Sequence, residues 1–445
     1  MIPISTISPK NSTVLSVGER VLLLRKNKGV SQLELAEIIR ARQEKIVSVE
    51  KGNDEYTEVQ LNAIREHFNI AGMPITGREC VAFRERLYLW RDLIRNRSTD
   101  IVKEMHREMA NISNIEPYAH DLIMLYKMIE IQLYLVNNDI ATAEKLFNAI
   151  ANSLDDMNDE CMYHYYNIKG YLSCINERHE EGLMFYLKAL EIKELYGNAI
   201  PADDARLPYN ISTCYTLFDI PYKAISYAQM ACEMHIEARV VNFDLHINHM
   251  MALNYIKVNQ LQEAEKLLDK ILLKAESIKD DFHISRILFG YGLMHKKTEN
   301  VPLAIEYFDK ALKYAHDNRD NYNSACYQKI HCIIQTRAFS KAEQALEQAK
   351  KKCGQDVVWT TYFEALSCYL SISRRMTTPN DKASEYIETV AIPHFHKSYD
   401  YILSLDYYEL LEQHYEKSRR AKKVLPMTKA ILSIYKRCFA HQERR

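Results

Sequence analysis

Apolar residues between positions 17 and 70 recur with the spacing of short helices, and helix-ending residues separate the stretches. Gly29 ends the first stretch, and Ser31 followed by Glu34 has the spacing of an N-terminal capping box. Gly52 closes a third stretch, and Thr57 can cap a fourth. We therefore expect four short helices around a small core. The expected core positions are Val17, Val21, Leu24, Leu33, Leu35, Ala36, Ile38, Ile39, Ile46, Val49, Val59, Leu61, Ile64 and Phe68.

A second pattern repeats along most of the remaining chain. A small residue is followed four positions later by a second packing residue, usually large and apolar, and three positions further on by a third. Such triplets recur about every forty residues, which is the signature of a repeat architecture. The triplets are Ala143/Phe147/Ile150, Gly182/Tyr186/Ala189, Ala224/Ala228/Ala231, Ala264/Leu268/Ile271, Ala304/Phe308/Ala311, Ala342/Leu346/Ala349, Ala383/Ile387/Val390 and Ala421/Leu425/Thr428.

Another set of small residues stands about twelve positions before several triplets, where two helices have to approach closely. These residues are Gly170, Ser212, Ala252 and Gly292. A related pair of helices, Val81–Asn96 and Thr99–Asn111, precedes the triplets, and Trp90 is expected to pack inside it. The pattern thus predicts about nine helix pairs, stacked as a right-handed tetratricopeptide-like superhelical solenoid.

The composition agrees with an all-α fold and limits the partners. Only 11 Gly and 11 Pro occur in 445 residues, which favours helices with short connections. The net charge of -1 gives no overall field that would attract nucleic acid, so any DNA contact must be local. The 10 Cys form no CxxC pair, and no apolar run of membrane-spanning length or signal peptide is seen. We expect a cytoplasmic protein that does not associate with membranes.

The expected domain boundary lies around the segment from Gly72 to Gly77, which contains Met73-Pro74. The chain would then comprise a disordered tail (1–15), a helix-turn-helix domain (16–71), a linker (72–79) and a repeat domain (80–440). The segment that follows the boundary is the most basic of the chain, and it either contacts DNA or forms a solvated linker face. Its arginines are Arg78, Arg84, Arg86, Arg91, Arg95 and Arg97.

The first region resembles the XRE/Cro helix-turn-helix, with RKNKGVSQLELAE at 25–37 and IVSVEKG at 46–52. Its turn departs from that family by carrying Arg40-Ala41 in place of Gly and a small apolar residue. The resemblance implies that the third helix enters the major groove, and that Arg25 and Glu50 tie the first helix to the third. Gln can bond adenine in bidentate fashion, and Lys or Arg contacts phosphate. The predicted DNA-contacting residues are Gln32, Arg42, Gln43, Glu44, Lys45, Ser48 and Lys51.

The stacked helix pairs offer an inner surface that suits an extended peptide. Asn side chains on the inner helices can satisfy both the donors and the acceptors of a peptide backbone. Each of these residues could instead make hydrogen bonds within or between repeats, or simply pack. The predicted peptide-binding residues are Asn167, Tyr171, Asn210, His246, Asn248, His249, Tyr327 and His331, and Asn254 also falls on such a helix.

The stretch YNISTCY at 209–215, followed by AISYA at 224–228, resembles the tetratricopeptide repeat. Together with the XRE-type region, it makes the whole chain similar to the RRNPP family of Gram-positive bacteria and their phages. That resemblance implies a homodimeric quorum-sensing transcriptional regulator that binds operator DNA and a short signalling oligopeptide. It also implies that an Asn in the Tyr-Asn-apolar-small context contacts the peptide backbone, which points to Asn210 first and then to Asn167.

Sequence motifs for enzymatic chemistry are absent: GxxxxGK[ST], GxGxxG after a strand, GxSxG and HExxH do not occur. His394 and His396, one residue apart on a helix, point in different directions, and no second cluster completes a metal site. We therefore expect no catalysis, cofactor or metal. Two alternatives stay open, which are an adaptor or phosphatase-like protein that binds a response regulator, and a DNA-binding protein whose repeats only dimerise.

Overall fold

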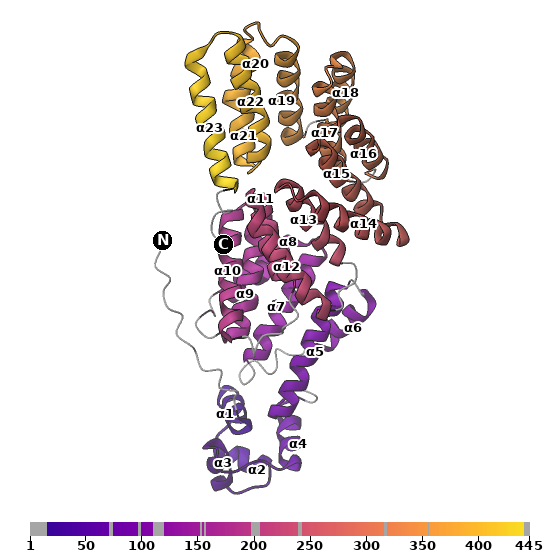
Figure 1. The fold of residues 1–445 in the computed structure, drawn as a ribbon. Helices are drawn as coiled ribbons and strands as arrows, with labels where there is room; N and C mark the ends of the chain where they lie inside the picture. The colour runs from indigo at the N-terminus through magenta and orange to yellow at the C-terminus, as the bar shows by residue number, and fades with distance from the viewer. Residues whose placement is uncertain are drawn as a thin grey trace. The chain divides into compact units, whose positions relative to one another are not determined.

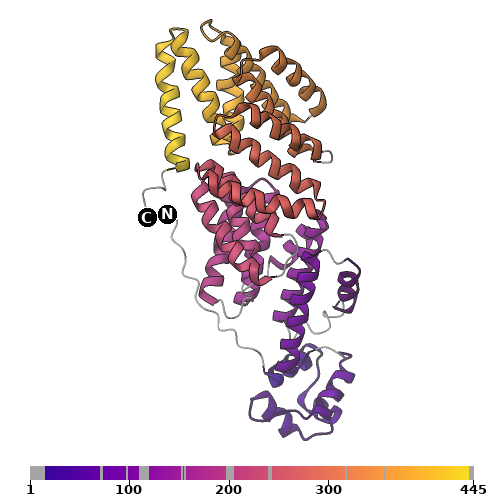
Figure 2. The ribbon, with the colours of Figure 1, turned by 45° about the vertical axis from the view of Figure 1, so that its right-hand side comes forward.

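The computed structural model describes residues 16–70, 74–96, 99–109, 120–151, 154, 157–196, 205–238, 243–315, 318–354 and 356–439. Every regular element in these ranges is a helix, as the sequence predicts. The chain forms two compact units, residues 1–202 (unit 1) and residues 203–445 (unit 2). Within each unit, helices that follow one another along the chain pack side by side (Figures 1 and 2). The predicted tail, 1–15, lies outside the described residues.

Unit 1 begins with four short helices, α1 Val17–Asn27, α2 Gln32–Ile38, α3 Gln43–Glu50 and α4 Glu58–His67. Capping boxes at Ser16, Ser31 and Thr57 start α1, α2 and α4, so that the orphan amides of each first turn find acceptors. Most of the expected core is buried, from Val21 to Phe68. The four-helix prediction is confirmed.

Two of the predicted core residues are exposed. Leu33 has 56% and Val59 has 80% of its surface open to solvent. Each stands two positions before a buried residue, Leu35 or Leu61, and two helical steps of 100° turn a side chain to the opposite face. Both residues lie in the first turn of their helix, where apolar character alone did not identify the buried side.

The turn between α2 and α3 explains the unusual Arg40-Ala41 pair. Arg40 has φ of 53°, in the left-handed region that Gly normally occupies. The amides of Arg40 and Ala41 donate to the carbonyls of Glu37 and Ala36, which closes the end of α2. The geometry of the turn is therefore kept although the residue that usually favours it is missing.

The remaining helices of unit 1 form pairs, and their bounds are α5 Gly77–Arg95, α6 Thr99–Met109, α7 His120–Val136, α8 Ile140–Ile150, α9 Asp159–Ile175 and α10 His179–Tyr196. Trp90 of α5 is fully buried, and its indole N–H donates to the Val102 carbonyl of α6 at 3.2 Å. The predicted opening pair and its internal tryptophan are thus confirmed.

The helices of unit 2 continue the same order. Their bounds are α11 Arg206–Leu217, α12 Pro221–Ala238, α13 Phe243–Lys257, α14 Leu261–Ser277, α15 Asp281–Lys297, α16 Val301–Tyr314, α17 Arg319–Gln335, α18 Phe339–Cys353, α19 Val357–Arg374, α20 Asp381–Tyr386, the π-helical turn η4 Ile387–Ala391, α21 Ile392–Lys397, α22 Tyr401–Lys417 and α23 Ala421–Phe439.

The turns inside the helix pairs explain how the chain manages with so few glycines. In most pairs the second residue after the first helix adopts a positive φ without being Gly, and these positions recur about every forty residues. The following amide bonds back to a carbonyl of the last helical turn, as in Asp139 to Tyr134 at 2.9 Å. The left-handed turn residues are Asn138, Glu177, Asp219, Asn259, Glu299, Arg337 and Arg419.

Contacts within the pairs confirm the small positions and most triplets. A Cβ placed on Gly170 would lie 2.7 Å from the ring of Tyr186, and one placed on Gly292 would lie 2.4 Å from the ring of Phe308. Both aromatic residues are the middle members of predicted triplets, and both are buried. The first helix of the pair therefore needs a residue without a side chain where the second helix presents its ring.

The last two triplets deviate from the predicted phase. Val390 is 42% exposed and Ala391 is buried instead, because the π-helical turn η4 inserts an additional residue. Leu425 is 59% exposed, whereas Ile434 and Cys438 are buried on α23. Since α23 is the last helix of the described array, only one of its faces packs against other helices. Its contacts with the preceding helices determine which face that is.

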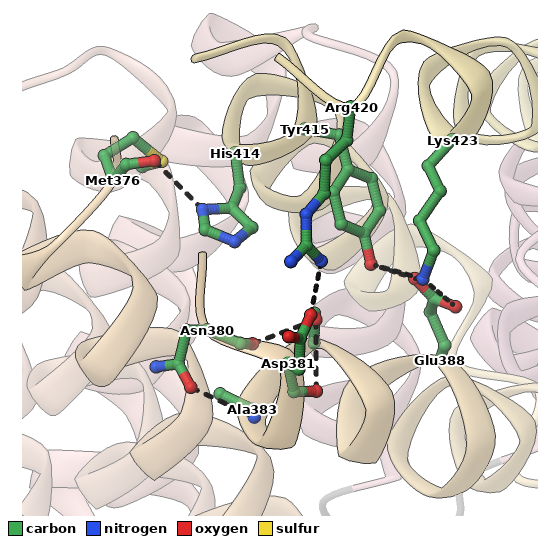
Figure 3. Close-up of polar contacts among 10 residues, drawn as sticks. Met376, Asn380, Asp381, Ala383, Glu388, His414, Tyr415, Arg420 and Lys423 are labelled. Carbon is green, nitrogen blue, oxygen red and sulfur yellow. Dashed lines mark hydrogen bonds and ion pairs between the residues drawn. The ribbon is translucent and has the colours of Figure 1, made fainter. Parts of the chain in front are cut away.

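Polar contacts attach the start of α23 to α20 and η4 (Figure 3). Arg420 pairs with Asp381 at 2.5 Å, and Lys423 lies 3.2 Å from a carboxylate oxygen of Glu388. Tyr415 of α22 donates its hydroxyl hydrogen to the same Glu388. These contacts account for the exposure of Leu425, since the charged residues around it face α20 and η4.

The predicted boundary at 72–79 stays a prediction. Residues 71–73 lie outside the described residues, and Ile70 and Ile75 on either side are both buried. Arg65 of α4 also pairs with Glu79 of α5. The first four helices and the first repeats accordingly belong to the same compact unit, and the two units divide at residue 202.

Candidate DNA- and peptide-binding surfaces

One face of α3 is open to solvent. Gln43 and Glu44 are exposed, and together with Ser48 and Lys51 they line a shallow depression on this face. Ile46 and Val49 are buried on the opposite side. A helix with one exposed polar face and an anchored apolar face has the shape required for insertion into a major groove.

The other predicted DNA-contacting residues are placed differently. Arg42 is exposed directly before α3, whereas Lys45 is half-buried with its Nζ 2.7 Å from Asp54. Gln32 donates its amide hydrogen to Glu50 at 2.7 Å. Lys45 must therefore exchange its partner before it can meet a phosphate, and Gln32 contributes to the internal structure of the bundle.

The internal pair implied by the XRE resemblance is present. Arg25 donates from Nε and Nη2 to the two carboxylate oxygens of Glu50, and Nη2 lies 2.8 Å from Oε2. Both side chains are largely buried. The hydrogen bonds raise the pKa of Arg25, while burial of Glu50 is outweighed by its bonds to Arg25 and Gln32, so that its pKa is lowered. This pair fixes α3 relative to α1.

Four of the predicted peptide-binding residues are accessible. Asn167 is half-buried on α9 in unit 1, and Tyr171 lies four positions later on the same face with 39% exposure. In unit 2, Asn210 of α11 and His246 of α13 are also half-buried. The His246 ring lies 6.5 Å from the ring of Tyr209, the neighbour of Asn210. Polar side chains of adjacent first helices are therefore close together in unit 2.

The surroundings of His246 are basic. Burial, followed by the nearby charges of His283 and Arg286, lowers the pKa of His246 to about 4, so the ring is neutral at pH 7. Burial also lowers the pKa of Arg286, which has no ion pair with a described residue. The local acid, Asp280, is bonded to His283 at 2.6 Å. Arg286 thus places a guanidinium in this part of unit 2 without an ion pair to a described carboxylate.

The other four predicted peptide-binding residues are buried and bonded within the chain. Asn248 donates to the Asp244 carbonyl at 2.8 Å, and the His249 ring lies 3.0 Å from the Arg286 carbonyl. The hydroxyls of Tyr327 and Tyr407 are 2.6 Å apart. His331 is 1% exposed and meets the ring of Tyr369 edge to face, while Asn254 donates to the Thr216 hydroxyl and the Met250 carbonyl. The structure favours a packing role for these residues, because helical phase alone did not separate the inner face from the faces between helices.

The pattern along single helices did not predict an aromatic pocket in unit 2, because its walls come from four helices. Phe289 of α15 and Trp359 and Tyr362 of α19 form its aromatic sides. Asp320 of α17 accepts a hydrogen bond from the Trp359 indole at 3.0 Å, and Asp400, directly before α22, accepts one from the Tyr362 hydroxyl. Trp359, an aromatic residue in the first turn of a first helix, was the available signal.

Asp400 is held in an unusual environment. Burial, followed by repulsion from Asp219, raises the pKa of Asp400 to about 7, although Lys257 acts in the other direction. Lys257 itself pairs with Asp219, which also accepts a hydrogen bond from the Ile402 amide at 2.9 Å. The turn after α11 is thereby bonded to the start of α22, and Asp400 receives no ion pair from a described residue.

Comparison with protein-family models gives no match. Two characterised proteins are similar to the chain over most of their own length. "Regulatory protein RapD" of Bacillus subtilis is 20% identical over 274 residues, which cover 60% of this chain and 75% of RapD. "Transcriptional activator NprA" of Geobacillus stearothermophilus is 22% identical over 349 residues, which cover 76% of this chain and 84% of NprA.

Solved structures show the same fold. The apo form of the quorum sensor NprR from B. thuringiensis has a TM-score of 0.63 and 20% identity, and the match covers 79% of this chain and 98% of NprR. A Rap protein complexed with Competence and Sporulation Factor has a TM-score of 0.65 and 15% identity, covering 81% and 99% of the two chains. The chain is therefore similar in sequence to RapD and NprA, and it has the fold that NprR and Rap proteins share.

The Tyr-Asn-apolar-small context on which the prediction for Asn210 rests lies in α11. Tyr209, Asn210, Ile211 and Ser212 supply this context on α11, and Ile211 and Ser212 are both buried. The Ser212 hydroxyl donates to the Ala224 carbonyl of α12 at 2.7 Å, which anchors this face of α11 inside the pair. Asn210 is left half-exposed on the adjoining face.

The described part of the chain contains no group of three His, Cys, Asp or Glu side chains that could hold a metal ion. His394 faces the ring of Tyr362, while His396 lies against Ser404 and Tyr401. The two histidines therefore point to different neighbours, as their spacing predicts. None of the described helices is long and apolar enough to cross a lipid bilayer.

Proposed function

We propose that the chain is a quorum-sensing transcriptional regulator without catalytic activity of its own. Its helix-turn-helix binds operator DNA, and its repeats bind a short signalling oligopeptide that changes this DNA binding. The observation that carries the proposal is the combination, in one chain, of an exposed α3 anchored by Arg25 and Glu50 with tetratricopeptide-like helix pairs.

The DNA-binding part of the proposal rests on α3. Gln43, Ser48 and Lys51 project from its exposed face and would meet base edges or phosphates, with Arg42 at the helix start. Two such helices in a homodimer would read the two halves of a pseudo-palindromic operator. The name of one relative, transcriptional activator NprA, agrees with a role in transcription.

The peptide-binding part rests on the accessible side chains of the first helices, Asn167, Tyr171, Asn210 and His246. An Asn amide can donate to and accept from an extended peptide backbone. NprR in complex with its cognate peptide NprX is one of the structures that share the fold, with a TM-score of 0.60. A peptide would act as a signal by binding one conformation of the repeats more tightly than another.

A chain of ionic contacts in unit 1 offers a route from the repeats to the helix-turn-helix. Arg20 of α1 lies 3.9 Å from Asp121 of α7, which pairs with Arg84 of α5 at 3.0 Å. Arg84 also lies 3.1 Å from Glu160 of α9, the helix that carries Asn167. A peptide that moves α9 would therefore change the support of α1. Most of these groups are shielded from solvent, so their interactions are only weakly screened.

A second candidate function is an adaptor that binds a response regulator, and the similarity to RapD favours it. The structure named aspartyl phosphate phosphatase F from Bacillus subtilis also has this fold, with a TM-score of 0.51 and 16% identity. The two functions differ in whether the chain binds duplex DNA. The exposed polar face of α3 favours the regulator.

Two measurements test the proposal on the full chain. Selection from a pool of random-sequence duplexes should enrich a two-fold symmetric site, and calorimetry with synthetic peptides encoded by neighbouring short reading frames should find a ligand. Enrichment of no duplex would refute the regulator and leave the adaptor. Binding of none of the peptides would refute the receptor and leave a DNA-binding protein whose repeats only dimerise.

A further inference from the structure

The aromatic pocket of unit 2 combines aromatic rings with acidic side chains. Its sides are the rings of Phe289, Trp359 and Tyr362, and its polar groups include the carboxylates of Asp320 and Asp400. The rings of Trp359 and Tyr362 lie 5.2 Å apart at 43°, so they form two inclined walls. Aromatic faces carry negative electrostatic potential, which adds to that of the carboxylates.

No described cation neutralises these carboxylates. Asp320 has no ion pair, and the adjacent Arg319 is turned away to Asp356 and to the Cys353 carbonyl. Asp400 has none either, since Lys257 lies on Asp219. The remaining nearby cation, Lys296, pairs with Asp406 at 3.5 Å and bonds Gln328. Asp320 therefore gives the pocket a negative charge, and Asp400, whose pKa burial raises to about 7, adds a second one when it is ionised.

Hydrogen bonds hold both carboxylates in place before any ligand arrives. The Trp359 indole donates to Asp320 at 3.0 Å, and the Tyr362 hydroxyl donates to Asp400. The two residues that form the aromatic walls thus also orient the acids. A site whose groups are already positioned loses less conformational entropy when it binds.

The opposite charge lies one helical turn away on α15. Arg286 precedes Phe289 by three residues, and its guanidinium is directed toward the ring of Phe282 at 5.4 Å, away from the pocket. His246 and His283 lie on that same side. A cation is therefore repelled by Arg286 and attracted by the carboxylate of Asp320.

We propose that this pocket binds a cationic group of the signalling peptide, an ammonium or guanidinium, on the aromatic side formed by Trp359 and Tyr362 and against Asp320 and Asp400. The proposal rests on the proposed function for the statement that the ligand is a peptide. The pocket itself selects by charge. A Lys side chain, an Arg side chain and a peptide N-terminus share this chemistry, and they can be distinguished by experiment.

The test uses the full chain, with the fluorescence of Trp359 as the signal. Trp90, the other tryptophan, is fully buried in unit 1, and Trp359→Phe identifies the part of the signal that comes from the pocket. The probes are N-acetyl-argininamide, N-acetyl-lysinamide and glycinamide, with N-acetyl-norleucinamide and N-acetyl-glutamic acid amide as uncharged and anionic counterparts. The test variant is the double variant Asp320→Asn/Asp400→Asn. Asp309→Asn on α16 serves as the matched control.

At least one cationic probe should half-saturate the signal at a concentration about tenfold lower than that needed for the norleucine probe. The double variant should lose this preference, and Asp309→Asn should keep it. Equal responses to cationic, neutral and anionic probes, or a preference that survives in the double variant, would overturn the cation pocket. Heptapeptide mixtures that carry Arg, Glu or Leu at one fixed position and random residues elsewhere separate the two proposals. The binding of the Arg mixture is compared with that of the Glu and Leu mixtures. Peptide binding without charge preference refutes the pocket alone, and cation binding without any peptide binding refutes the peptide receptor alone.

Discussion

The guanidinium of Arg25 in α1 holds the carboxylate of Glu50 in α3 through paired hydrogen bonds, with Nη2 2.8 Å from Oε2. Neither charge is well exposed to water, and Gln32 supplies a third bond to the same carboxylate. The orientation of the DNA-facing helix therefore depends on an interaction inside the bundle.

Replacement of Glu50 by Gln should loosen α3, because Arg25 would keep a largely buried charge without a counter-charge. We expect the opening free energy of α3 to fall by about 3 kcal/mol. Hydrogen exchange of peptides from α1 to α3 measures this locally, which suits a chain with two units. The apolar double variant Arg25→Leu/Glu50→Leu should recover much of the protection. Unchanged exchange in Glu50→Gln would show that the pair contributes little.

The exposed face of α3 should determine DNA binding. Gln43→Ala together with Lys45→Ala should abolish the shift of a duplex obtained by random-pool selection, since a base contact and a phosphate contact are lost together. Gln262→Ala, an exposed Gln on α14, is the matched control and should bind normally. Normal binding by the double variant in a gel-shift titration would refute the assignment of α3.

The close approach of α15 to α16 should tolerate no side chain at Gly292. A methyl group there would lie 2.4 Å from Phe308, so Gly292→Ala should lower stability by about 1–3 kcal/mol. Gly77→Ala provides the control, because nothing lies within 4 Å of its Cβ position. Hydrogen exchange of α15 and α16 distinguishes the two variants. Equal protection in both would mean that the pair can separate without cost.

Asp400 should give unit 2 a pH-dependent stability of a defined sign. Burial raises the pKa of Asp400 to about 7, whereas an Asp in an unfolded chain titrates near 3.9. Between about pH 4 and pH 7 the folded state keeps a proton that the unfolded state releases, so the free energy of unfolding falls as pH rises. Asp400→Asn should remove about 1–3 kcal/mol of this decline.

Urea unfolding at pH 5 and pH 8, followed by Trp359 fluorescence in a Trp90→Phe background, measures the effect in unit 2. The free energy of unfolding of Asp309→Asn should equal that of the parent protein at both pH 5 and pH 8. Parallel pH dependence of Asp400→Asn and the parent would contradict the elevated pKa. The neutral side chain should also keep the hydrogen bond from Tyr362, since an amide oxygen accepts as a carboxyl oxygen does.

The sequence predicted the fold well because its signals are local. Capping residues such as Ser31 and the match of Gly292 with Phe308 act over one or two neighbouring helices, so helical spacing alone reveals them. The failures occurred where a larger context decides. Val390 is exposed because a π-helical turn shifts the phase of its helix. Leu425 lies on a terminal helix whose buried face depends on its neighbours.

The candidate sites were less predictable, for a physical reason. The burial of Tyr327 and His331 results from side chains of α19 and α22 that lie against α17, which no spacing within α17 could show. The pocket around Trp359 combines residues more than one hundred positions apart, from Phe289 to Asp400. Side chains on one helix can be assigned to a face from sequence, but the neighbours opposite that face are fixed only by the stacking of the repeats.

The most direct test of the account is the affinity of the full chain for a selected operator duplex, measured by fluorescence anisotropy with and without the peptide that binds in calorimetry. The account predicts that saturating peptide changes the Kd at least about fivefold, and that Asn210→Ala shifts the required peptide concentration upward while leaving the peptide-free Kd unchanged. A peptide that binds the chain yet leaves the Kd for DNA unaltered would contradict it.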